Sequence, residues 1–291
     1  MSGSAIQKRI NPKPADLGEF SVKRALPAAS QKTVGPFIFF DHFGPTEFEP
    51  GKGVAVRPHP HIGIATVTYL FEGEIIHRDS LGYEQAIQPG AVNWMTAGRG
   101  IVHSERTRPS LVETGSKMHG IQAWVALPLE DEECEPDFTH YPVEGLPVID
   151  TNGVWMRLIC GSAFGMKSEV KSRSPIFYVE VKTDNAGSVV LTDEYTERAL
   201  YLVSGNLRID GEIIEEGEML IFKAGATTTI ESLDASRFML LGGEPLEEDR
   251  TVWWNFVSSR KDRIEQAKLD WKQNRFKAVP GDSEFIPLPK D

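Results

Sequence analysis

The chain has 291 residues, 40% hydrophobic and 25% charged, which is the balance of a globular protein with enough chain for two domains and excludes a disordered or fibrous one. Its formal net charge of −11 at pH 7 argues against a broad attraction to phosphate backbones, so direct binding of nucleic acid is not expected. The two cysteines, which have no C-x-x-C spacing, exclude a disulfide framework and a zinc knuckle.

Targeting signals are not visible in the sequence. Residues 1–9 contain Lys8 and Arg9 but no apolar run behind them, so they do not have the pattern of a secretory signal. No window approaches the roughly 18 uninterrupted apolar residues that a membrane helix needs. Two thiols without a pairing pattern suit a reducing compartment. We therefore expect a cytoplasmic protein that does not engage a membrane.

Short apolar segments separated by turn residues follow one another through the first half of the chain. They are rich in β-branched and aromatic residues, as strands are, and Gly or Pro residues between them indicate turns. The predicted strands are residues 37–40, 64–71, 75–77, 84–87, 91–95 and 120–125. Strands at such regular spacing favour a sandwich or a barrel.

A second series of strand-like segments follows a Pro- and acid-rich stretch at 128–136, which we interpret as a linker. These strands are predicted at residues 155–160, 176–181, 188–191, 198–203, 207–209, 218–222, 227–230 and 238–242. The segments YLFEG at 69–73 and YLVSG at 201–205 are alike, and each enters a hairpin, which indicates one unit used twice. We predict an all-β protein of two tandem barrels, one in residues 1–140 and one in residues 141–291, the second followed by a C-terminal helical tail within that range.

The segment from Glu247 to Lys277 has a different pattern. Its apolar residues fall at steps of 4, 7, 3 and 4, which is the spacing of one helical face: Trp253, Val257, Ile264, Ala267 and Trp271. We therefore predict one or two amphipathic helices after the second barrel. The apolar face is expected to pack back on a barrel, and docking of a partner is the alternative.

Two pairs of side chains have the spacing of metal ligands on strands. His59 and His61 lie two residues apart in RPHPH, and His103 and Glu105 lie two residues apart in GRGIVHSE. Because residues two apart on a strand share a face, each pair points to one side. If the two strands are neighbours across a small barrel, three imidazoles and a carboxylate converge on one metal ion in a cupin-like arrangement.

The donor set restricts the metal and suggests its chemistry. Three imidazoles and one carboxylate suit Fe(II), Mn(II), Ni(II), Cu(II), Co(II) or Zn(II), whereas Ca²⁺ prefers oxygen ligands. Four protein ligands leave an octahedral ion two positions for a substrate oxygen and dioxygen. Gly98 and Gly100 are expected to form a turn with positive φ just before His103. The other histidines have no such pairing and are interpreted as ordinary residues: His42, His77, His119 and His140.

Several long blocks of the sequence resemble the pirin family of bicupin proteins. They are residues 39–45 (FFDHFGP), 57–63 (RPHPHIG), 68–73 (TYLFEG), 77–82 (HRDSLG) and 95–105 (MTAGRGIVHSE), with 254–257 (WNFV) and 263–268 (RIEQAK) near the end. The resemblance implies two cupin barrels closed by a C-terminal helix. It also implies that iron, as Fe(II), is bound by His59, His61, His103 and Glu105. Because His140 is the last histidine, the second barrel is expected to be metal-free.

The resemblance to pirins implies two functions from different classes. One is a dioxygenase that cleaves quercetin or a related flavonol with dioxygen, in which Glu105 is both ligand and catalytic base because a carboxylate can shift from the metal to a bound hydroxyl. The other is an iron-dependent coregulator that acts through protein contacts. Other cupin chemistry on an aromatic substrate remains open, since the fold does not dictate the reaction. We expect a monomer whose partners are a small aromatic substrate and dioxygen.

Overall fold

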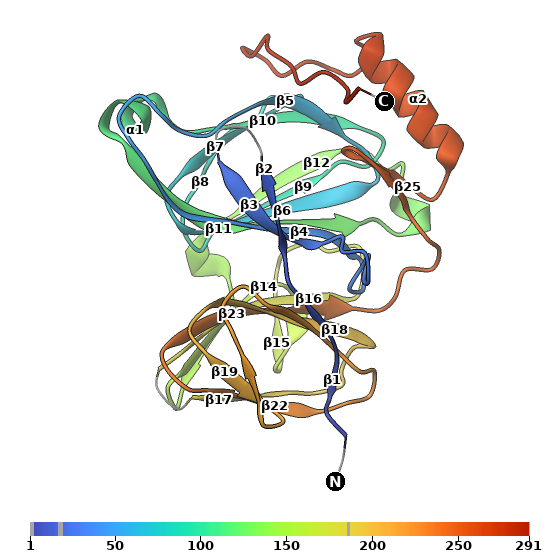
Figure 1. The fold of residues 1–291 in the computed structure, drawn as a ribbon. Coiled ribbons are helices and arrows are strands. Elements are labelled where there is room, and N and C mark those ends of the chain that lie inside the picture. The colour runs from blue at the N-terminus through green and yellow to red at the C-terminus, as the bar shows by residue number, and fades with distance from the viewer. Residues whose placement is uncertain (1–2, 17–19, 185–186, 291) are drawn as a thin grey trace. The chain divides into compact units, whose positions relative to one another are not determined.

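The computed structural model describes residues 3–16, 20–184 and 187–290, and the chain forms two compact units (Figure 1). Unit 1 comprises Met1–Pro14, Lys23–Phe39 and Glu144–Leu246. Unit 2 comprises Ala15–Val22, Phe40–Val143 and Glu247–Asp291. Neither unit is one uninterrupted stretch of sequence, and the division at residue 140 stays a prediction about the extent of the two cupin repeats. None of the helices in the described parts of the chain is long and apolar enough to cross a membrane.

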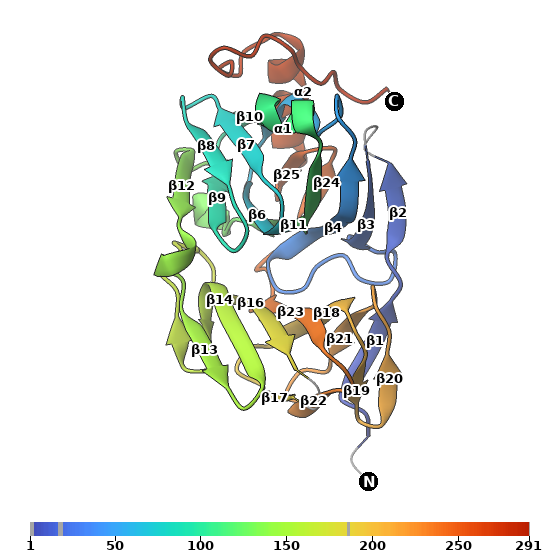
Figure 2. The same cartoon turned by 90° about the vertical axis from the view of Figure 1, so that its left-hand side faces the viewer.

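Unit 1 is built from two antiparallel sheets. The larger has the order β1 (Ile6–Ile10), β21 (Met219–Phe222), β18 (Glu197–Ser204), β23 (Ser236–Gly243), β16 (Ile176–Thr183), β14 (Val154–Ala163) and β13 (Val148–Thr151), with β15 (Met166–Lys167) paired to β14. Figure 2 shows these strands in reverse order from left to right, from β13 to β1. The smaller has the order β17 (Ser188–Leu191), β22 (Thr228–Ser232), β19 (Leu207–Ile209) and β20 (Glu212–Ile214). Apolar side chains of both sheets, among them Leu200, Leu240, Ile209 and Ile230, form one buried core.

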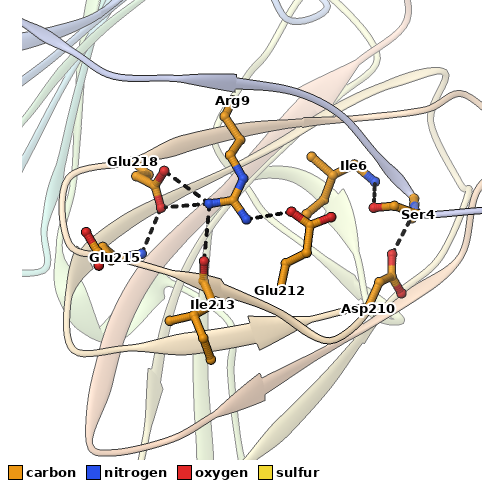
Figure 3. Close-up of polar contacts among 9 residues, drawn as sticks. Ser4, Ile6, Arg9, Asp210, Glu212, Ile213, Glu215 and Glu218 are labelled. Carbon is orange, nitrogen blue, oxygen red and sulfur yellow. Dashed lines mark hydrogen bonds and ion pairs between the residues drawn. The ribbon is translucent and has the colours of Figure 1, made fainter.

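One arginine ties β1 to its neighbours in unit 1 (Figure 3). The strand pairs antiparallel with β21. The Arg9 guanidinium lies 2.8 Å from Glu212 Oε2 and 3.3 Å from Glu218 Oε1, and it also donates to the carbonyl of Ile213. Because the Arg9 side chain is 33% exposed, solvent screens these ion pairs.

Unit 2 also contains two antiparallel sheets. One has the order β5 (Ala55–His61), β10 (Ile101–Arg106), β7 (Ile75–Asp79) and β8 (Glu84–Ile87). The other runs β12 (Asp137–Tyr141), β9 (Val92–Thr96), β6 (Ile64–Glu72) and β11 (Ser116–Ala126), and continues through β4 (Phe37–Phe48), β3 (Ser21–Leu26) and β2 (Lys13–Asp16). Residues 13–14, 23–26 and 37–39 of these last three strands are counted with unit 1. Buried Leu70, Met118, Ile75 and Ile87 join the two sheets in one core. Short helices are α1 (Pro109–Thr114) and the 3-10 turns Leu129–Asp131 and Val143–Gly145.

The strand predictions agree with the structure, and the all-β fold of two cupin domains is confirmed. The strands at 84–87, 188–191 and 207–209 have the predicted bounds, and the others lie at the predicted places with ends shifted by a few residues. The largest extension is that of β4, which continues to Phe48 through a proline after Gly44. Strands without a predicted counterpart include β1, β2, β3, β12, β13, β15 and β20.

The Pro- and acid-rich segment at 128–136 is not a linker. Its Glu132 is buried and accepts hydrogen bonds from Ser258 Oγ at 3.0 Å and from the Ser259 N–H at 2.9 Å. The Arg250 Nε lies 2.6 Å from the same carboxylate. Acidic composition suggested a solvated connection, but this carboxylate anchors the returning C-terminal segment inside unit 2.

The C-terminal segment contains a hairpin before its helix. Strands β24 (Thr251–Trp253) and β25 (Phe256–Ser258) pair, and the helix α2 runs only over Lys261–Lys272. The prediction of helix at Trp253 and Val257 is therefore wrong, because Phe256 bridges to Ile62 of the barrel and draws these residues into strands. Ile264 and Ala267 of α2 are buried in one apolar cluster with Ile62 and Phe256. This burial favours core packing over docking of a partner.

Candidate metal centre

Three predicted ligands come together on the neighbouring strands β5 and β10. His103 is the register partner of His59, and Ile101 is the partner of His61. The ring centroids are 4.4 Å apart for His59 and His103, 5.0 Å for His59 and His61, and 5.1 Å for His61 and His103. One nitrogen from each ring lies within 4.8 Å of the other two, and all three residues are buried. This buried group could hold a metal ion.

The turn before β10 depends on glycine, as predicted. Gly98 has φ of +49° and Gly100 has φ of +150°. A Cβ on Gly98 would lie 2.1 Å from the carbonyl oxygen of Cys134, so no side chain fits there. The close approach and the left-handed backbone both require glycine. This turn directs β10 alongside β5 and so places His103 opposite His59.

The unmet hydrogen-bonding capacity of the rings fits a metal ion. The His59 Nδ1–H donates to the Arg57 carbonyl at 2.9 Å, which leaves Nε2 with its lone pair. His61 Nδ1 and His103 Nε2 are buried without a hydrogen-bond partner in the described part of the chain. Buried polar atoms are normally satisfied, so these nitrogens point to a ligand. A borderline divalent transition metal suits such imidazole donors.

Burial also keeps the imidazoles in the form that binds metals. It lowers the pKa of His59 to about 4, against the opposing hydrogen bond to Arg57. Burial and repulsion from His59 hold the pKa of His61 well below its usual range, and burial with neighbouring histidines does the same for His103. At neutral pH all three rings are therefore uncharged, and no proton must leave before a metal ion binds.

Glu105 is close to the centre but does not join the three histidines. The pairing of β10 with β5 shifts register between His103 and Glu105, so that Glu105 faces Val56. Its Oε1 accepts a hydrogen bond from Thr68 Oγ1 at 3.3 Å, and its carboxylate is not in the group of mutually close ligand atoms. Burial raises the pKa of Glu105, and the nearby His77 and the Thr68 hydrogen bond work against that rise.

His77 is a site residue that the sequence analysis took for an ordinary histidine. It lies on β7 as the register partner of Glu105, and its Nδ1 is 3.4 Å from the Nδ1 of His103. Its Nε2 is 2.9 Å from the Oδ2 of buried Asp79, and its ring stacks on Phe138 at 4.3 Å. Asp79, His77 and His103 thus form a buried chain behind one candidate ligand. The spacing of His77 and Asp79, two residues apart on a strand, was the signal that could have revealed it.

Comparisons with known proteins agree with the fold and show the family. The family model described as Pirin matches residues 19–125, and that described as Pirin C-terminal cupin domain matches 178–277. A "Pirin-like protein" of Caulobacter vibrioides is 53% identical over 94% of this chain and 96% of its own length. A Pseudomonas aeruginosa protein named "Putative quercetin 2,3-dioxygenase" is 37% identical over 96% and 86%. The crystal structure of a quercetin 2,3-dioxygenase from Acinetobacter baumannii matches with a TM-score of 0.90 and 33% identity, over 98% of this chain and 95% of that one.

Proposed function

Because the chain belongs to the pirin family, we propose that it is a metal-dependent dioxygenase that cleaves quercetin or a related flavonol or aromatic enediol with dioxygen. The observation that carries the proposal is the convergence of three buried, uncharged imidazoles on β5 and β10. The names of two relatives, one compared by sequence and one by structure, support the reaction class.

We assign His59, His61, His103 and Glu105 as the ligands, with Fe(II) as the metal. Mn, Ni, Cu, Co and Zn accept the same donors, and availability in the cell selects among them. A bound metal ion would lower the pKa of a chelated substrate hydroxyl and provide positions for the reacting oxygens. For Glu105 to bind it, one carboxylate oxygen must move towards the three histidines, and Thr68 restrains the carboxylate through one long hydrogen bond of 3.3 Å.

Glu105 is the proposed catalytic base. Its half-buried carboxylate has a pKa raised by burial, so it is a better proton acceptor than an exposed glutamate. In our proposal it takes the proton from the substrate hydroxyl, and Thr68 Oγ1 orients the carboxylate meanwhile. His77, the cross-strand neighbour of Glu105, adds a polar group beside the same carboxylate.

Aromatic side chains near the histidines would orient a flat substrate. The ring of Trp124 lies 5.1 Å from that of His61, and Phe138 stacks on His77. Stacked and edge-to-face contacts of this kind favour planar aromatic ligands. They also keep water from the reacting atoms, which strengthens the electrostatic interactions of Glu105.

Oxygen consumption tests the proposal directly. Protein purified without air and loaded with Fe(II) is expected to consume dioxygen in proportion to the flavonol lost when quercetin is added. His61→Ala should bind no stoichiometric metal and consume no dioxygen while keeping its fold, and His119→Gln, outside the histidine group, is the matched control. A full metal equivalent retained by His61→Ala would remove His61 from the site. No consumption by the iron-loaded protein would instead favour the regulatory function or another substrate.

A second variant tests the role of Glu105. Glu105→Gln is expected to lower kcat by about 10²- to 10⁴-fold, the usual contribution of a general base, with a smaller loss of metal affinity. Steady-state kinetics at measured metal occupancy checks this. If turnover and metal affinity fall by the same factor, Glu105 is a ligand only.

A further inference from the structure

Four polar side chains lie at one level of the sheet that contains β12, β9, β6 and β11. Gln122 on β11 is the register partner of Thr68 on β6. Asn93 on β9 is the partner of both Thr68 and His140 of β12. Directly opposite residues of antiparallel strands project from the same face, so the four form a continuous row, which we call the polar row. Thr68 also contacts Glu105, and the polar row therefore faces the candidate metal centre.

Apolar side chains lie on both sides of the polar row. The row two residues nearer the histidines is mostly apolar and consists of Trp124, Thr66, Met95 and Phe138. Trp124 contacts His61 and Phe138 stacks on His77, so this apolar row lies at the level of the candidate ligands. Two residues the other way, Leu70 is fully buried in the core of unit 2. The polar row is thus a polar band within the barrel.

The polar row is not fully satisfied by its own hydrogen bonds. Thr68 Oγ1 shares its single proton between Gln122 Oε1 at 2.8 Å and Glu105 Oε1 at 3.3 Å. The ring of His140 is bonded through Nδ1 to Asn93 Oδ1 at 2.6 Å. The Nδ2 of Asn93 has no partner in the described part of the chain, although Asn93 is only 3% exposed. A buried donor without a partner destabilises the structure, and a hydrogen bond to an oxygen of a ligand would remove this cost.

We propose that the polar row is a substrate-recognition subsite for hydroxyl groups at the end of an aromatic substrate remote from its metal-chelating oxygens. This inference rests on the proposed function and specifies its substrate class as aromatic enediols that carry further hydroxyl groups. Two residues along a strand span about 6.6 Å, so the polar row is displaced from the level of the histidines by roughly the extent of a substituted ring. Asn93 Nδ2 donates to a remote substrate oxygen, and half-buried Gln122 and His140 supply further polar contacts.

The test compares two flavonols with the same chelating group, quercetin and its analogue galangin, which lacks the hydroxyls on the remote ring. Their Kd values are measured without air on Fe(II)-loaded protein by fluorescence quenching. Wild type is expected to bind quercetin at least tenfold more tightly, and Asn93→Leu is expected to reduce that preference about tenfold by weakening quercetin alone. Equal affinity of the two flavonols for wild type, or equal weakening of both in Asn93→Leu, would overturn the proposal.

Two further variants guard against misfolding and an unspecific effect. His140→Phe changes a half-buried residue at the sheet edge and removes the partner of Asn93, so it should also reduce the preference. Met95→Leu, on the same strand but in the apolar row, should keep the preference, and losing it would contradict the assignment to the polar row.

The same binding data separate this inference from the proposed function. A preference for quercetin that depends on Asn93, without any dioxygen consumption, would support the subsite and reject the dioxygenase. Dioxygen consumption with equal binding of both flavonols would support the dioxygenase and reject the subsite.

Discussion

The two cupin barrels differ in what fills them. In unit 1, apolar side chains from both sheets form one core that includes Leu200, Leu220, Leu240, Ile209 and Ile230. Unit 2 also has buried apolar clusters, but part of its interior is lined by buried polar side chains, namely the histidines, Asp79 and Asn93. The same architecture therefore gives two kinds of barrel. We call unit 1 the filled barrel, because apolar side chains fill it, and unit 2 the lined barrel, because buried polar side chains line part of it. Chemistry follows from the lining and not from the fold.

The contrast is also clear on β18 of unit 1. It presents the buried Arg198 and no histidine. The guanidinium donates to the carbonyls of Thr192 at 2.5 Å, Ala226 at 2.6 Å and Lys223 at 2.6 Å. A cation bound to three carbonyls stabilises the loops of this barrel and offers a metal ion no lone pair.

The largest expected effect comes from breaking the filled barrel. Leu240→Ala should lower the free energy of unfolding by about 3–5 kcal/mol, because it removes a fully buried side chain and leaves a cavity. Urea unfolding measures the loss, and Val190→Ala, at a site 51% exposed in the same unit, is the matched control. Metal stoichiometry should stay unchanged. A loss of metal in Leu240→Ala would show that the two barrels are not independent in function.

Mild acid should lower the stability of unit 2 through its histidines, because every histidine of the chain lies between residues 40 and 143 of that unit. The pKa of His59 is about 4 in the folded protein and 6.5 when unperturbed. Between these values the unfolded chain binds a proton that the folded chain does not, so the free energy of unfolding falls as the pH falls. For His59 the loss from pH 7 to pH 5 is about 2 kcal/mol. Urea unfolding of the metal-free protein at both pH values should show it, and His59→Asn should show a smaller loss; an equal loss would exclude His59 as the cause.

Removing the group behind a candidate ligand should weaken metal binding without abolishing it. His77→Phe deletes the link between Asp79 and His103, and such supporting residues typically contribute 10- to 100-fold to metal affinity, so a loss of about that size is expected. Competition with a chelator for the metal alone measures the affinity. His77→Gln, which can still hydrogen-bond, should recover part of it. Unchanged affinity in His77→Phe would show that His103 needs no such support.

The smallest effect is expected at the surface of unit 1. Arg9→Ala removes the ion pairs with Glu212 and Glu218, but exposed pairs contribute about 1 kcal/mol or less. Urea unfolding should place this variant close to wild type and far from Leu240→Ala. A loss above 2 kcal/mol would mean that the pairing of β1 depends on Arg9 more than on its backbone hydrogen bonds.

Much of the fold was predictable because strand patterns are local. Runs such as 84–87 and 207–209 combine β-branched residues with flanking turns, and their bounds agree with the structure. The hairpin of β24 and β25 was not predictable, since its apolar spacing also fits a helix. The bridge between Phe256 and Ile62, which are far apart in the sequence, favours the strand over the helix.

The candidate site shows the same division between local and long-range information. The alternation of a strand predicted that His59 and His61 share a face, and adjacency to β10 brought in His103. A register shift beyond His103 depends on how two strands pair, so the sequence alone could not place Glu105. The polar row was equally hidden, because its four residues come from four strands and align only through the registers of the sheet.

Because the C-terminal segment packs in unit 2, the two units receive their last segments at different times during synthesis. Phe256, which bridges to Ile62 beside His61, is added to the growing chain 194 residues after Ile62. At synthesis rates of about 5 to 20 residues per second, the histidines of β5 wait roughly 10 to 40 s for the hairpin and helix that cover this strand. The 3-10 turn near Glu132 must likewise wait for Ser258 and Ser259. The barrel that carries the histidines, although encoded first, is therefore the last of the two to receive all of its segments.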